Sequence, residues 1–126
     1  FDREVAPHLG ERIRYHGAVG GEARLHALGH AQALLHLINF DEPFGLSVIE
    51  AMACGTPVIA IARGSMAELI DDGVTGLLVD GTGGAITALT RIEAIDRAAC
   101  RRAVEARFSV EAMADKYLAL YRSILA

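Results

Sequence analysis

The sequence is poor in several residue types, and each scarcity excludes a class of protein. Its 126 residues include no tryptophan and only two cysteines, Cys54 and Cys100. Two cysteines so far apart cannot supply a disulfide framework, so reduced thiols in a cytoplasmic protein are expected. No apolar run approaches the roughly 20 residues that a membrane-spanning helix needs. The first ten residues lack the basic and apolar regions of a signal peptide.

Positive charge is scarce as well. Twelve Lys and Arg stand against sixteen Asp and Glu, a formal net charge of −4. We therefore expect no nucleic acid and no anionic membrane as a partner, and an anionic small ligand would need a local cluster of donors. With 52% hydrophobic residues, the composition is that of a single globular domain over 1–126. The opening "FDREVAPHLG" has no initial Met and resembles the end of a helix, which indicates a chain cut from something longer.

Short apolar segments alternate with helical patterns over the first two thirds of the chain. Strands are expected over 13–16, 33–38, 57–61 and 75–80, the last three as near-continuous apolar runs buried on both faces. Helices are expected over 22–28, 45–54 and from Ser65, an N-cap with Glu68 at capping-box spacing, to a stop near Gly73. The alternation predicts an α/β fold, a Rossmann-like parallel sheet with helices on both faces.

The last third is expected to be helical. After the Gly-rich turn "GTGG", helices are predicted over 85–93 and from about 96, so that helices fill about 85–126. Ser109 is the expected N-cap of the last helix. An apolar stripe with i, i+3, i+4, i+7 spacing follows it, and such a stripe predicts a face packed against the core. Its members are Val110, Met113, Ala114, Tyr117, Leu118, Tyr121, Ile124 and Leu125.

The loop "NFDEPFG" carries the strongest functional signal. It follows the expected strand 33–38 and leads into the helix from Gly45, and ligands of doubly wound sheets bind where strand ends meet helix starts. Pro43 suits the first helical positions, where its missing N–H has no partner to lose. The N–H groups of Phe44, Gly45 and Leu46 would then be free donors at the positive end of a helix, which favours a phosphate.

Two carboxylates flank this expected anion site. Glu50 lies four residues after Leu46, on the same helix face and one turn deeper. There it would accept hydrogen bonds from vicinal hydroxyls such as those of a ribose, while Glu42 would reach toward the group that the phosphate carries. The pattern thus predicts a nucleoside diphosphate joined to a polyhydroxy group. Two plainer hypotheses stay open: Glu42 only favours the helix dipole, and Glu50 is only a solvated helix residue.

The segments "EPFGLSVIEAMACGTPVIA" and "GSMAELIDDGVTGLLVD" resemble the donor-binding half of GT-B glycosyltransferases, specifically the retaining family-4 group. The mark of that group is two glutamates separated by seven residues, here Glu42 and Glu50. The resemblance covers about 14–79. It implies a partial C-terminal domain of a GT-B fold, from an enzyme that transfers a sugar from a nucleotide-diphosphate sugar with retention of configuration and without an obligatory metal or other cofactor.

The same resemblance implies roles for individual residues. Glu50 would hold the ribose, and Glu42, the catalytic candidate, would meet hydroxyls of the donor sugar. The N–H groups of Phe44, Gly45 and Leu46 would face the sugar and the diphosphate. "RYHG" resembles the strand end that passes the nucleotide base, which makes Tyr15, His16 and Gly17 further donor-binding candidates.

The chain also departs from the family. Leu37 stands in "HLINF", where the family often has Pro or Ser before the loop, and the Arg and Lys that neutralise the diphosphate have no counterpart. The acceptor-binding N-terminal domain is absent as well, so the fragment alone is expected to be inactive. A binding module without transfer activity, or an interaction domain, are the alternatives.

Other residues of the chain carry weaker functional signals. The pair His26 and His30 could share a metal, but no third ligand lies nearby in sequence, so a surface pair is favoured. Gly64 and Ser65 are expected to border the donor pocket, and Arg63 is expected not to touch phosphate. Truncation would leave a sheet edge and the last helix uncovered, which predicts self-association through one of them.

Overall fold

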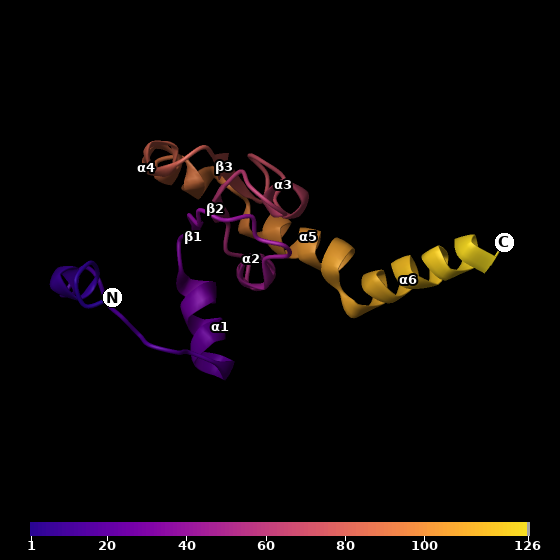
Figure 1. Cartoon of the computed structure of the whole chain (residues 1–126), viewed down its shortest axis with the longest axis horizontal. Helices are drawn as coiled ribbons and strands as arrows, with labels where there is room; N and C mark the ends of the chain where they lie inside the picture. Colours follow the sequence, from indigo (N-terminus) through magenta and orange to yellow (C-terminus); the bar gives the residue numbers. More distant parts are fainter. Residues whose placement is uncertain (126) are drawn as a thin grey trace.

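A three-stranded parallel sheet lies at the centre of the structure, a computed structural model that describes residues 1–125 (Figure 1). Its strands are β1 (Leu34–His36), β2 (Val58–Ile61) and β3 (Gly76–Val79), in the order β1-β2-β3. Val58 is in register with Leu34 on one side and Gly76 on the other. All three carboxyl ends therefore meet at one edge of the sheet. The predicted α/β parallel sheet is confirmed.

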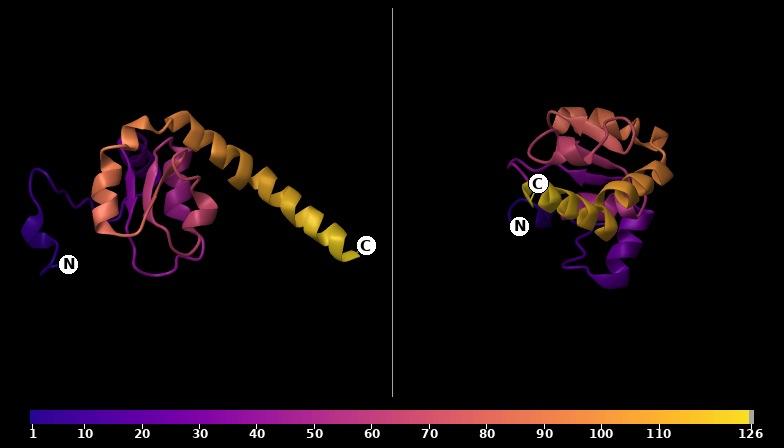
Figure 2. Two further views of the ribbon diagram at one scale, coloured as in Figure 1. Left: turned by 90° about the horizontal axis from the view of Figure 1, so that it is seen from above. Right: turned by 90° about the vertical axis from the view of Figure 1, so that its right-hand side faces the viewer.

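Helices connect and flank the strands. In chain order they are η1 (Ala6–His8), α1 (Gly21–His30), α2 (Leu46–Ala53), α3 (Met66–Leu69), α4 (Thr82–Leu89), η2 (Ile92–Ala94), α5 (Arg97–Phe108) and α6 (Val110–Leu125). Both α2 and α4 contact β2, and they lie on opposite sides of the sheet (Figure 2). The prediction of helices on both faces is thus confirmed, with α5 packed along α2.

The core lies around β2 and α2. Val58, Ile59 and Ala60 of β2 are fully buried, and so are Val48 and Met52 of α2. Both segments are almost entirely apolar in sequence, so burial removes their side chains from water at little polar cost. The predicted helix 45–54 and strand 57–61 agree with α2 and β2 to within one residue at each end.

Two helix starts form as their sequences indicate. Asp96 is the N-cap of α5, where its carboxylate accepts a hydrogen bond from Ala98 N at 2.9 Å. The side-chain hydrogen bond from Arg102 and the backbone bond from Ala98 lower the pKa of Asp96. At α6, Ser109 Oγ accepts from Ala112 N at 3.1 Å, the bond expected of an N-cap.

The strand expected over 13–16 is wrong. These residues form no strand, and Tyr15 is 66% exposed. A strand is stabilised by a hydrogen-bonded neighbour, and no described residue pairs with this segment. The strand 33–38 is also shorter than expected, and Leu35 is half exposed because β1 forms one edge of the sheet.

Two helix expectations also need correction. Ser65 precedes α3, but its side chain makes no capping bond, because its hydroxyl donates instead to Phe44 O at 2.9 Å. The helix placed at 85–93 begins at Thr82 and is followed by η2. Its Gly83 and Gly84 belong to the first turn, where Asp80 and Val79 lie so close to Gly84 that they leave little room for a side chain. The Gly-rich segment is therefore a helix start and not a turn.

The stripe of α6 does not pack on the core. No residue of this helix is buried, and Tyr117, Leu118 and Ile124 are 53%, 49% and 70% exposed. Figure 2 shows why: α6 extends away from the sheet. The amphipathic pattern predicted the helix correctly, but nothing in residues 1–125 covers its apolar face. None of the helices within 1–125 is both long enough and apolar enough to cross a membrane.

The two thiols are expected to differ in reactivity. Cys100 is fully buried beside Thr75 O, at 3.4 Å, and burial raises the pKa of its thiol from 9.0, whereas Cys54 is partly exposed. An aromatic disulfide reagent is therefore expected to label Cys54 alone in the folded chain and both cysteines in urea.

Because the folded state keeps the Cys100 proton above pH 9.0, where the unfolded state loses it, the free energy of unfolding should fall as pH rises beyond that value. Urea unfolding at several pH values checks this, and a Cys100→Ala variant that falls equally would contradict it.

Candidate functional site

The loop of residues 37–45 joins the carboxyl end of β1 to the start of α2. Gly45 ends it in the left-handed region, with φ at +90°. The backbone conformation calls for glycine, and a Cβ at Gly45 would also displace the side-chain ends of Met66, at 2.8 Å, and Leu69, at 3.0 Å. This glycine fixes the angle at which the loop enters α2, and thereby the direction of the first N–H groups of the helix.

A second loop, residues 62–65 after β2, holds the first in place. Ser65 N donates to Glu42 O at 2.9 Å, and Arg63 Nη1 donates to Asn39 O at 2.5 Å. Arg63 Nε also lies 3.7 Å from an Asp41 carboxylate oxygen. The Arg63 side chain is thus engaged by the loop. Gly64 and Ser65 border the loop and contact its backbone at Glu42, so their observed role is to hold the loop in place.

The start of α2 offers three free donors. Val48 N and Ile49 N donate to Gly45 O, at 3.1 and 3.3 Å. Within residues 1–125 the N–H groups of Gly45, Leu46 and Ser47 have no acceptor. Phe44 N differs from the expectation, because it donates to Glu42 Oε1 at 3.4 Å. N–H groups at the positive end of a helix can together bind an anion.

The two glutamates lie on either side of this helix start. Glu42 is partly buried on the loop, and within residues 1–125 the one hydrogen bond to its carboxylate comes from Phe44 N. Glu50 is partly buried on α2, and its Oε1 lies 3.2 Å from Arg24 Nη2 of α1. An ion pair as exposed as this one contributes about 0.2–1 kcal/mol. Glu50 is therefore a partnered carboxylate, and sequence reasoning missed Arg24 because 25 residues separate the two.

Tyr15, His16 and Gly17 are not brought to this loop. The Tyr15 ring packs on Phe1, with centroids 4.7 Å apart, and Gly17 has φ at +63°. The hydrogen bonds of residues 1–19 stay within that segment. In Figure 1 the segment lies beside α1, away from α2. Their expected role at a nucleotide base stays a prediction.

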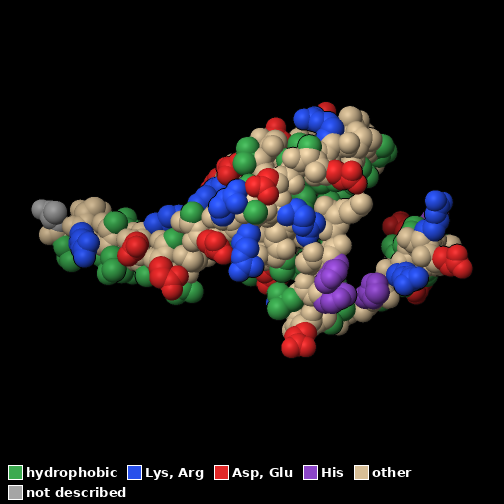
Figure 3. All heavy atoms as spheres, turned by 180° about the vertical axis from the view of Figure 1, so that it is seen from behind, with side chains coloured by type: hydrophobic (Ala, Val, Ile, Leu, Met, Phe, Trp, Pro, Cys, Tyr) green, Lys and Arg blue, Asp and Glu red, His purple; other side chains and the backbone are tan. Residues whose placement is uncertain are grey.

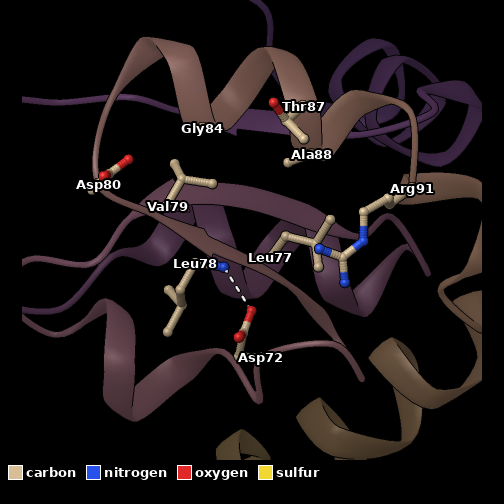
Figure 4. Close-up of a pocket in the computed structure, with 9 residues that line it drawn as sticks. All are labelled: Asp72, Leu77, Leu78, Val79, Asp80, Gly84, Thr87, Ala88 and Arg91. Atoms are coloured by element: carbon tan, nitrogen blue, oxygen red, sulfur yellow. Dashed lines mark hydrogen bonds between the residues drawn. The ribbon is translucent and has the colours of Figure 1, made fainter.

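Two hollows of the surface lie outside the pair of glutamates. One, of about 490 Å³, runs between β3 and α4 and is bordered by Asp72, Asp80 and Arg91 (Figure 4). There the Asp72 carboxylate accepts a hydrogen bond from Leu78 N at 2.9 Å, so this backbone N–H of β3 is not free for a ligand. The other, of about 340 Å³, lies between the start of α2 and the α5–α6 junction, with Phe44 and Leu46 in its wall. Only the second hollow adjoins the free donors.

The histidines do not form a metal site. His26 and His30 stack with ring centroids 4.1 Å apart, and His30 Nδ1 donates to His26 O. Histidines gather over α1 and the segment before it on the face shown in Figure 3, but no group of three or more His, Cys, Asp or Glu able to hold a metal exists within residues 1–125. His26 and His30 thus lie together on the surface of α1, as the sequence indicated.

Residues 6–114 match the family model described as glycosyl transferases group 1. The D-inositol 3-phosphate glycosyltransferases of Mycobacterium marinum and Mycobacterium tuberculosis are each 41% identical to the chain, over 104 and 109 residues. These alignments cover 74% and 78% of this chain and 22% of each relative. The chain thus spans about a fifth of the length of the curated relatives it matches.

Solved structures give the same result. Sucrose-phosphate synthase from Thermosynechococcus elongatus superimposes with a TM-score of 0.74 at 36% identity, over 94% of this chain and 31% of that one. Anabaena HepE, solved in complex with UDP, superimposes with a TM-score of 0.65 at 27% identity, over 77% and 29% of the two chains. Together with the family match, these likenesses show that the chain belongs to the group 1 glycosyl transferases, with the Rossmann-like architecture of the GT-B fold.

Proposed function

We propose that this chain is the donor-binding part of a retaining glycosyltransferase, which transfers a sugar from a nucleotide-diphosphate sugar to an acceptor held by another domain. The observation that carries the proposal is the start of α2: three free N–H donors lie between Glu42 and Glu50 at the carboxyl edge of a parallel sheet. Membership of the family and the UDP in the HepE structure support it.

Each group at this site has a defined task in the proposal. The N–H groups of Gly45 and Leu46 bind the diphosphate. Glu50 accepts hydrogen bonds from the ribose, and Glu42 those of the donor sugar. As the glycosidic bond breaks, negative charge grows on the departing diphosphate, and donors already aimed at it lower the barrier without a metal. Further cations for the diphosphate and the acceptor site would come from outside residues 1–126, so this chain by itself is expected to transfer no sugar.

Calorimetric titration of the chain with UDP, GDP and ADP tests the donor site. One of the three is expected to bind saturably, and Glu50→Ala to weaken it about tenfold, because a hydrogen bond to a charged group is lost. Thr90→Ala, which removes an exposed hydroxyl on the far side of the sheet from α2, is the matched control and should bind as the unsubstituted chain does. Absence of binding by all three nucleotides would refute the proposal.

A binding module without transfer activity is the second candidate. The observation that favours it is the engagement of Arg63 by Asn39 and Asp41, which leaves the described loops at this edge without a free cation for a leaving diphosphate. The two candidates differ in the longer protein: release of nucleoside diphosphate from a nucleotide sugar on addition of acceptor supports transfer. Binding of the donor without release would support the module.

Self-association through the exposed face of α6 or the open edge of β1 is also proposed. An exposed apolar face on one 16-residue helix is a common site of pairing between chains. Light scattering is expected to show a dimer, and Tyr117→Glu with Ile124→Glu to give a monomer if α6 is the interface. A clean monomer of the unsubstituted chain at high concentration would count against the proposal.

We also propose that the protein lies in the cytoplasm, where two free thiols such as Cys54 and Cys100 stay reduced.

A further inference from the structure

Arg24 is the residue near the proposed donor site to which no role has yet been given. It lies on α1, and its Nη2 approaches Glu50 Oε1 of α2 at 3.2 Å. Among the ion pairs of residues 1–125, this is the one that joins α1 to α2. Glu50 is also the sole charged residue of α2, so Arg24 faces the carboxylate that the donor site would use.

The contact occupies only one oxygen of the carboxylate. Arg24 Nη2 lies against Oε1 as an ion pair, and no hydrogen-bond donor within residues 1–125 reaches the Glu50 carboxylate. The Oε2 atom therefore keeps its lone pairs for a ligand hydroxyl. A carboxylate drawn toward a cation samples fewer orientations than a free glutamate side chain, and so loses less freedom on binding.

Stability alone gives little reason for this pair. The two side chains are 46% and 36% exposed, and ion pairs of such exposure add little to folding. The partner is also placed by a second element, since α1 contacts α2 and carries Arg24 in its first half. A guanidinium with several N–H donors suits a fixed orientation better than a lysine, whose ammonium is a point charge.

We propose that Arg24 is a positioning residue, which orients the Glu50 carboxylate so that its second oxygen accepts the vicinal hydroxyls of a ribose. The inference rests on the proposed nucleotide site and concerns one feature of it, the preference for a ribose over a sugar without those hydroxyls. Arg24 acts through Glu50 and touches no reacting atom.

The test compares each bound nucleoside diphosphate with its 2′,3′-dideoxy form by calorimetry. The unsubstituted chain is expected to prefer the ribose form by about tenfold, the effect of a hydrogen bond to an ionised carboxylate. Glu50→Gln should abolish most of this preference. Arg24→Gln should reduce it to about threefold while changing affinity for the dideoxy form little, and Arg24→Lys should restore part of it, since a cation again contacts Glu50.

The control is Arg102→Gln, which breaks an exposed pair with Asp96, at 2.9 Å, and should leave the preference unchanged. A merely structural Arg24 would weaken both nucleotides alike, and that result overturns the inference while the donor site stands. If the preference for the ribose form survives in Arg24→Gln but is lost in Glu50→Gln, the inference is also overturned, while the donor site stands. If the unsubstituted chain binds no nucleotide, the proposed function itself fails, and the inference with it.

Discussion

Replacement of Gly64 by alanine is expected to lower the free energy of unfolding by about 2–4 kcal/mol. A Cβ at this position would lie 2.6 Å from both Glu42 N and Glu42 O, and 3.0 Å from Asp41 C. These are backbone atoms of the loop that enters α2, so no side chain can turn aside to make room. Gly64 also has φ at +55°, a region that costs alanine about 1 kcal/mol.

Urea unfolding followed by circular dichroism measures this effect. Gly73→Ala is the matched control, because Gly73 has φ at +78° but nothing lies within 4 Å of the Cβ it would gain. The control should lose only about 1 kcal/mol, the cost of the backbone conformation. Equal losses in the two variants would show that the loops separate freely, and would contradict the tight contact between residues 62–65 and Glu42.

The Gly64 variant also tests the site. Ser65 N–H binds Glu42 O and Ser65 Oγ binds Phe44 O, so loops pushed apart by a methyl group lose both bonds. The N–H groups at the start of α2 would then point in a new direction. Affinity for the nucleoside diphosphate is expected to fall in Gly64→Ala and to stay unchanged in Gly73→Ala.

The parts of the fold that sequence reasoning predicted are those whose signal is local. The apolar runs at β2 and β3, the helix start near 96 and the N-cap Ser109 need only neighbouring residues to form, and the structure has them. The strand at 13–16 and the packing of α6 depended on partners elsewhere, and no described residue provides them. A pattern predicts that a segment can be a strand or an amphipathic helix, but it does not say what covers it.

The candidate site divides in the same way. Glu42, Gly45 and Glu50 were found because one loop and one helix hold them at fixed spacing in sequence. Arg24 and Ser65 were given other roles or none, because they reach the site from other elements. The Ser65 hydroxyl shows the physical reason: a helix N-cap and a bond to Phe44 O compete for one side chain, and tertiary contact decides between them.

A junction between α1, the start of β2 and α5 is expected to be the other large contributor to stability. Arg97 donates to Ala31 O and Gly29 O, both at 2.7 Å, and to Thr56 Oγ1 at 2.9 Å. Thr56 is fully buried, and its hydroxyl donates in turn to Leu28 O. The guanidinium of Arg97, the first residue of α5, thus donates hydrogen bonds to two carbonyl oxygens at the end of α1.

Arg97→Ala is expected to destabilise the chain by about 2–4 kcal/mol, since three hydrogen bonds from a charged donor are lost. Thr56→Val, nearly the same shape without the hydroxyl, should cost about 1–3 kcal/mol, because Leu28 O keeps the bond from Ala31 N. The double variant should lose less than the sum of the two, as the Arg97–Thr56 bond is counted in both. Thr90→Val, whose exposed hydroxyl bonds only to Thr87 O, is the control.

Urea unfolding of the four variants decides the matter, and strict additivity would mean that Arg97 and Thr56 act independently. The junction also bears on the proposed nucleotide site. It anchors the end of α1, and α1 carries Arg24 against Glu50. If α1 is loosened in Arg97→Ala, Arg24 can no longer hold the carboxylate in one orientation. The preference for a ribose over a dideoxyribose nucleotide should then fall at temperatures where the chain is still folded.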